Sequence, residues 1–162
     1  MNKGLVWAVG VPLMWLSAVL DQGVVRHMTV FGARPHFLLI SAVILSLLSR
    51  PGGGAFTGFV SALLQGVISG ANLASYVLSR VITGFTASAT RMMGIEFTLP
   101  VIFAIMALAT FEAQILLMFL APPPSLLSFV GATIGEAIYN GVLAMPMYAL
   151  VRRLVGVSSR YY

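Results

Sequence analysis

Long apolar runs, broken at short intervals by charges and by proline or glycine clusters, dominate the sequence. The breaks are turn-forming stretches such as Arg50-Pro51-Gly52-Gly53-Gly54 and Ala121-Pro122-Pro123-Pro124. Six apolar segments lie between them, at approximately 4–25, 35–49, 55–69, 71–89, 97–120 and 125–151. Backbone groups in lipid must be hydrogen-bonded within their own segment, and the sequence lacks the alternating units of a barrel. The pattern therefore predicts six transmembrane helices in a single domain, residues 1–162.

The second and third segments are short for a membrane span. Each has 15 residues, which reach about 22 Å at about 1.5 Å per residue, against a hydrocarbon core about 30 Å thick. We therefore expect longer neighbours to shield them. The first segment runs past 20 residues, lacks an A-x-A cleavage site and precedes five further spans, so we expect it to be retained.

Composition makes a soluble protein untenable. Of the 162 residues, 59% are hydrophobic and 8% charged, against about 45–50% and about 25% in soluble domains. The mean hydropathy of +1.00 agrees with an all-α polytopic membrane protein. The chain has no cysteine, which excludes disulfides, thiolate catalysis, cysteine-ligated zinc and S-palmitoylation.

The basic residues predict the orientation of the helices. With both termini in the cytoplasm, Arg26 and Arg34 lie outside, and six basic residues lie inside: Lys3, Arg50, Arg91, Arg152, Arg153 and Arg160. This bias follows the positive-inside rule. It also explains much of the net charge of +5 without nucleic acid; we expect anionic lipid headgroups to be the counter-charge.

Small residues recur at a spacing of four, a pattern that lets helix backbones approach closely. They are Gly54, Gly58, Ala62, Gly66, Gly70 and Ala74. Because four residues turn a helix by about 400°, this close-packing stripe drifts by about 40° per step, and one partner helix can follow only part of it. We favour packing within the chain over contact with another protein, and keep both interpretations.

No motif for catalysis or cofactor binding emerges. Gly52-Gly53-Gly54 is not followed by the Gly-Lys-Ser/Thr of a phosphate-binding loop, and we interpret it as a loop. His27 and His36, with Asp21 as the one nearby acid, do not form a metal site of recognisable spacing, and we expect them at the membrane surface. The sequence thus predicts no catalytic, cofactor-binding or metal-binding residue, and no enzyme.

Ionisable side chains inside the spans are the strongest candidates for function, because charge is costly there. Arg80, Glu112 and Glu136 lie about 13, 12 and 16 Å from the outer ends of their helices, with Asn140 on the face of Glu136. These four residues predict a buried polar cluster: a substrate or proton site, or a structural tie between helices. We favour the tie, and expect Arg80 to pair with Glu112.

Two stretches carry a family resemblance. The helix-three region from Gly58 to Ala74 and the closing Asn140-Gly141-Val142-Leu143, Pro146 and Arg152-Arg153 resemble the MreD family of rod-shape-determining membrane proteins. The chain departs from the family pattern at Gly66, beside Gln65, where family members usually carry an acid. Any role of that acid cannot be transferred.

The resemblance implies a non-enzymatic component of the bacterial elongasome in the inner membrane. Such a component binds MreC and helps couple the peptidoglycan synthase of the lateral wall to the MreB cytoskeleton. The resemblance also implies a fold similar to the substrate-binding subunits of energy-coupling-factor vitamin transporters, which makes a small-molecule transport subunit the alternative. Those subunits dock through small residues on helix one, where this chain offers one such pair, Gly4 and Ala8.

The orientation is testable because the chain has no native cysteine. Single cysteines at Ser125 and Ser158 are expected to react with a membrane-impermeant maleimide from opposite sides of the membrane. Labelling of both from the same side would contradict an even number of crossings between the N-terminus and the tail.

Overall fold

In the computed structural model, the described residues are 3–23, 25, 28–29, 33–70 and 72–156. They form six α-helices and one short 3₁₀ turn, η2 (Thr90–Met93). The helices are α1 (Lys3–Gly23), α2 (Phe37–Leu47), α3 (Pro51–Ser69), α4 (Leu73–Ala89), α5 (Leu99–Leu120) and α6 (Leu126–Leu154). Arg26, His27, Ser158 and Arg160, used in the predictions above, lie outside the described residues.

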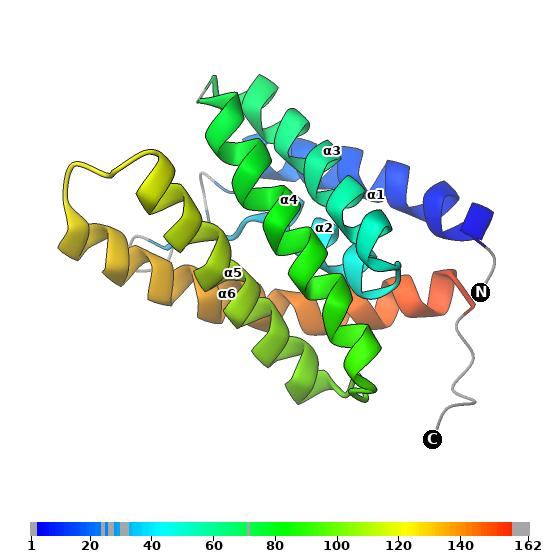
Figure 1. Cartoon of the computed structure of the whole chain (residues 1–162). Helices are drawn as coiled ribbons and strands as arrows, with labels where there is room; N and C mark the ends of the chain where they lie inside the picture. The colour runs from blue at the N-terminus through cyan, green and yellow to red at the C-terminus, as the bar shows by residue number, and fades with distance from the viewer. Residues whose placement is uncertain (1–2, 24, 26–27, 30–32, 71, 157–162) are drawn as a thin grey trace.

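Three helices are long and apolar enough to cross a membrane: α5, α6 and the stretch Val6–Gly23 of α1. In Figure 1 the start of α1 and the end of α6 lie at the same end of the bundle, with the α2–α3 turn. The described helices thus form an all-helical membrane protein. We call this end of the bundle the arginine end, because Arg50, Arg91, Arg152 and Arg153 lie there.

The third helix begins earlier than the pattern predicts. Gly52, Gly53 and Gly54 belong to the first turn of α3, so their interpretation as a loop is wrong. Pro51 occupies the first turn, where its missing N–H costs no helical hydrogen bond. The glycines are tolerated there because α3 is held by its neighbours rather than by helix propensity.

Helix α2 is a buried half-length helix rather than a second span. Its 11 residues reach about 16 Å, roughly half of a hydrocarbon core. Every residue from Leu38 to Leu48 is at most 4% exposed. The Leu38 carbonyl accepts a hydrogen bond from Ser61, halfway along α3. The helix therefore starts near the centre of the bundle and ends at the arginine end, enclosed as the sequence suggested for a short segment.

Helices α3 and α4 lie side by side in backbone contact (Figure 1). A Cβ on Gly58 would overlap the backbone carbonyl of Arg80, and Gly54 and Gly84 face each other in the same way. Ala62 is fully buried. The first half of the predicted close-packing stripe thus packs within the chain, against α4.

The last two positions of the stripe, Gly70 and Ala74, leave this contact. A Cβ on Gly66 would still meet α4, at the side chain of its first residue, Leu73. Gly70 ends α3 in the left-handed conformation, with φ of 61°, and has no neighbour that a Cβ would meet. Ala74 is exposed. The prediction is therefore wrong at Gly70 and Ala74, because the chain turns there and the spacing of four no longer marks one helix face.

Replacing Gly58 by leucine is expected to lower the free energy of unfolding in detergent by at least about 1–3 kcal/mol, because the side chain has to displace the α4 backbone. Gly131→Leu is the matched control, since a Cβ on Gly131 meets nothing within 4 Å. Chemical unfolding followed by circular dichroism measures both. Equal stability of the two variants would contradict the α3–α4 contact.

Candidate functional site

The carboxylate of Asp21, near the end of α1, binds the start of α2. Its two oxygens accept hydrogen bonds from the backbone N–H groups of Phe37, at 2.8 Å, and Leu38, at 3.1 Å. The first N–H groups of a helix have no partner within the helix, and the positive end of the helix dipole favours a negative charge. Asp21 supplies both the acceptors and the charge from another helix.

Asn140, fully buried halfway along α6, holds the residue before α2. Its Oδ1 accepts a hydrogen bond of 2.9 Å from the backbone N–H of His36, and its Nδ2 donates to Thr110 of α5 at 3.2 Å. One side chain thereby joins α5, α6 and the entry to α2. This fixes three elements at a depth where water cannot replace a missing partner.

Glu136 lies one turn before Asn140 on α6. Its Oε2 accepts a hydrogen bond of 2.5 Å from Gln114 of α5 and lies 3.6 Å from Nε2 of His36. The side chain of His36 is 26% exposed. The backbone and the ring of His36 are thus both engaged by α6.

Arg80 of α4 is 3% exposed, and its Nε and Nη1 have no hydrogen-bond partner in the described part of the chain. The groups that act electrostatically on its guanidinium are Tyr76, one turn earlier on α4, and then the acids Asp21 and Glu136. A buried guanidinium is tolerated when opposite charge lies close to it. Arg80 therefore interacts with these acids through the attraction of opposite charges and not through direct hydrogen bonds. We define the polar cluster as Asp21, His36, Arg80, Gln114, Glu136 and Asn140.

The expected pair of Arg80 with Glu112 is absent. Glu112 instead accepts a hydrogen bond of 2.6 Å from Thr86, six residues beyond Arg80 on α4. Helical side chains lean toward the N-terminus of their own helix, and α4 and α5 are antiparallel, so the two side chains lean apart although their depths agree.

The polar cluster joins α1, the entry to α2, and helices α4, α5 and α6. Within the described residues, no group of three or more His, Asp or Glu side chains is arranged to hold a metal ion. Both carboxylate oxygens of Asp21, Oε2 of Glu136 and Oδ1 of Asn140 accept hydrogen bonds from donors of the chain itself. Chemically, the arrangement orients helices and compensates buried charge.

Asp21, His36 and Gln114 were not predicted from the sequence as members of the polar cluster. The available signal was a carboxylate near the end of an apolar run, followed by a segment too short to cross the membrane. A segment of half the membrane thickness needs an acceptor for its buried start. Asp21 was the nearest acid in the sequence.

Fold and site together define a polytopic helical membrane protein with a polar centre built from its own helices. The sequence profile described as rod shape-determining protein MreD matches residues 1–157 of the chain. The chain belongs to the MreD family, a shape-determining structural family. Comparisons with curated proteins and with solved structures gave no match.

The partners of Arg80 can be tested by double-mutant cycles of unfolding in detergent. Arg80→Gln and Asp21→Asn are each expected to destabilise, and the double variant to lose at least about 0.5 kcal/mol less than the sum, because the charges interact. Arg80→Gln with Glu112→Gln is the matched cycle, expected to be additive within about 0.5 kcal/mol. Coupling to Glu112 and none to Asp21 would contradict the described site.

Proposed function

We propose that the protein is a non-enzymatic scaffold of the bacterial cell elongation machinery in the inner membrane. In this role it binds MreC, and through MreC it supports peptidoglycan synthesis and maintenance of the rod shape. The match of the MreD profile to residues 1–157, nearly the full length of the sequence, carries this proposal. Rod shape determination is the role that the family implies.

The chemistry of the site supports a scaffold rather than an enzyme. In the described part of the chain, the acids of the polar cluster accept hydrogen bonds from backbone and amide donors that hold helices in place. These hydrogen bonds serve the packing of the helices, while the outer surfaces of the helices remain available for protein partners.

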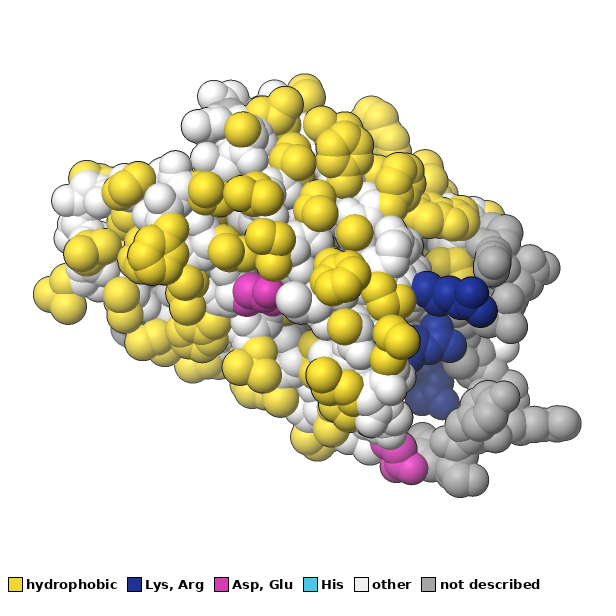
Figure 2. Space-filling model, in the orientation of Figure 1, with side chains coloured by type: hydrophobic (Ala, Val, Ile, Leu, Met, Phe, Trp, Pro, Cys, Tyr) yellow, Lys and Arg dark blue, Asp and Glu magenta, His cyan; other side chains and the backbone are white. Residues whose placement is uncertain are grey.

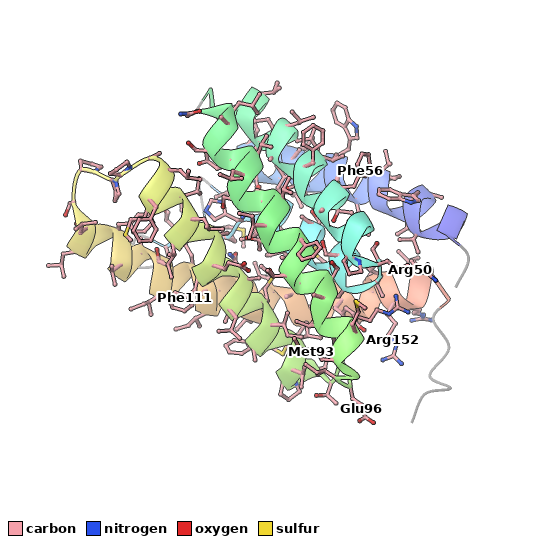
Figure 3. The ribbon with its side chains drawn as sticks, in the orientation of Figure 1. Arg50, Phe56, Met93, Glu96, Phe111 and Arg152 are labelled. Atoms are coloured by element: carbon pink, nitrogen blue, oxygen red, sulfur yellow. The ribbon has the colours of Figure 1, made fainter. Side chains whose placement is uncertain are left out.

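The proposed orientation places both termini in the cytoplasm. The start of α1 and the end of α6 lie at one end of the bundle (Figure 1), where Figure 3 also shows Arg50 and Arg152. Arg153 lies in the last turn of α6, and Arg91 binds the carbonyl of Leu48 at the same end. The positive-inside rule favours the cytoplasm for this end. MreB, on the cytoplasmic side, would then be reached through MreC, as the family resemblance implies.

We also propose that the fold is similar to that of the substrate-binding subunits of energy-coupling-factor transporters, which keeps a small-molecule transport subunit as the alternative function. Copurification distinguishes the two functions. The protein is tagged, cross-linked in the membrane of its own bacterium and purified, with an untagged strain as the control.

The scaffold predicts strong enrichment of MreC over the untagged control and loss of rod shape when the gene is deleted. In the deleted strain, the wild-type gene is expected to restore rod shape and the enrichment of MreC. The Gly58→Leu gene is expected to restore neither if that variant fails to fold. Enrichment of an ATPase module without MreC, in cells that keep their shape after deletion, would overturn the scaffold and support transport.

A further inference from the structure

A cavity of about 850 Å³ opens at the arginine end of the bundle, away from the polar cluster. It lies between the start of α1, the α2–α3 turn and the end of α4 with η2. This volume is within the range of small-molecule sites. Neither the family role nor the proposed binding of MreC assigns it a ligand.

Two arginines supply the polar side of the cavity. Arg50 and Arg91 both line it and are both exposed. Nη1 of Arg91 donates a hydrogen bond of 3.0 Å to the carbonyl of Leu48. That bond holds the Arg91 side chain at the turn, and its other nitrogens keep donors for a ligand. Among the described residues, no aspartate or glutamate lines the cavity, so its charge is complementary to an anion.

The remaining walls are largely apolar. Val6, Trp7, Leu48 and Met92 line the cavity. Trp7 packs edge-to-face on Phe56 with ring centroids 5.4 Å apart. Tryptophan and arginine at the end of a transmembrane bundle are typical of the level of the lipid headgroups. A soluble anion would use only the arginines, whereas a phospholipid would also use the apolar walls.

The surroundings reinforce the charge of the site. Figure 2 shows basic side chains gathered at this end of the molecule, and Figure 3 places Arg50 and Arg152 on the same side. The first turn of α3 also borders the cavity, through Pro51 and Gly53, and carries no side-chain cap. Its dipole adds to the attraction of the arginines for an anion.

We propose that this cavity binds an anionic phospholipid, with the headgroup phosphate at Arg50 and Arg91 and an acyl chain along Trp7 and Val6. Basic pockets between transmembrane helices are known to hold anionic headgroups. The lipid would bridge α1 to the α2–α3 turn and to η2. This role is independent of MreC.

Trp7 makes the test specific, because the chain has only two tryptophans. Trp15, which is 63% exposed, is replaced by phenylalanine, leaving Trp7 as the one tryptophan. The protein in an uncharged detergent is titrated with phosphatidylglycerol brominated on its acyl chains, and quenching of Trp7 reports the bound lipid. Brominated phosphatidylcholine of the same chain length is the second arm, and inorganic phosphate as competitor is the third.

Phosphatidylglycerol is expected to quench at a several-fold lower mole fraction than phosphatidylcholine, without displacement by millimolar phosphate. Arg50→Gln is expected to weaken the binding of phosphatidylglycerol about fivefold, because one basic residue contributes about 1 kcal/mol to the attraction of an anionic headgroup. Arg153 is an exposed arginine at the same end that does not line the cavity. Arg153→Gln is therefore the matched control, and it is expected to change the binding of phosphatidylglycerol less than twofold. Arg91→Gln serves as a second variant if its loss of the Leu48 contact leaves the protein folded.

Three outcomes would overturn the proposal. Equal quenching by both lipids would remove the requirement for negative charge. Equal effects of Arg50→Gln and Arg153→Gln would show that the preference for the anionic lipid comes from the general charge of the surface and not from the cavity. Displacement by inorganic phosphate would make the ligand a free anion rather than a lipid. Each of these outcomes is independent of whether MreC copurifies with the protein.

Discussion

A helix that begins inside a membrane bundle has to find acceptors for its first backbone N–H groups without water. Each group left unsatisfied there costs several kilocalories per mole. Helix α2 meets this requirement through Asp21 of α1 and Asn140 of α6, which bind the N–H groups of Phe37, Leu38 and His36. The rest of the bundle is arranged around this helix start.

Satisfying the helix start introduces a negative charge that needs its own compensation. Asp21 brings a carboxylate into the bundle, and Arg80 lies within electrostatic range of both Asp21 and Glu136. Arg80 can occupy this position because Gly58 allows α3 to approach the Arg80 backbone closely. The packing of α3 on α4 and the charge balance at the start of α2 therefore depend on the same residue.

The sequence predicted the existence and order of all six helices, because the ends of the apolar runs carry Pro, Gly or charge. It did not predict that α2 is too short to cross the membrane, since an apolar segment with polar ends looks the same whether it crosses a membrane or lies inside a bundle. Counting residues along the helices predicted that Arg80 and Glu112 lie at similar depths, but it did not predict which residues they interact with. Side-chain direction and helix crossing decide which groups at one depth meet, and neither can be counted along a chain.

The central claim is that the start of α2 is closed by Asp21 rather than by water. Amide hydrogen exchange at residue resolution, on the protein in detergent, tests it most directly. The amides of Phe37 and Leu38 have no acceptor within the helix, yet are expected to exchange as slowly as those in the middle of α2, and Asp21→Asn to accelerate them selectively. Fast exchange at both positions in the unmodified protein, or no change on Asp21→Asn, would contradict the account.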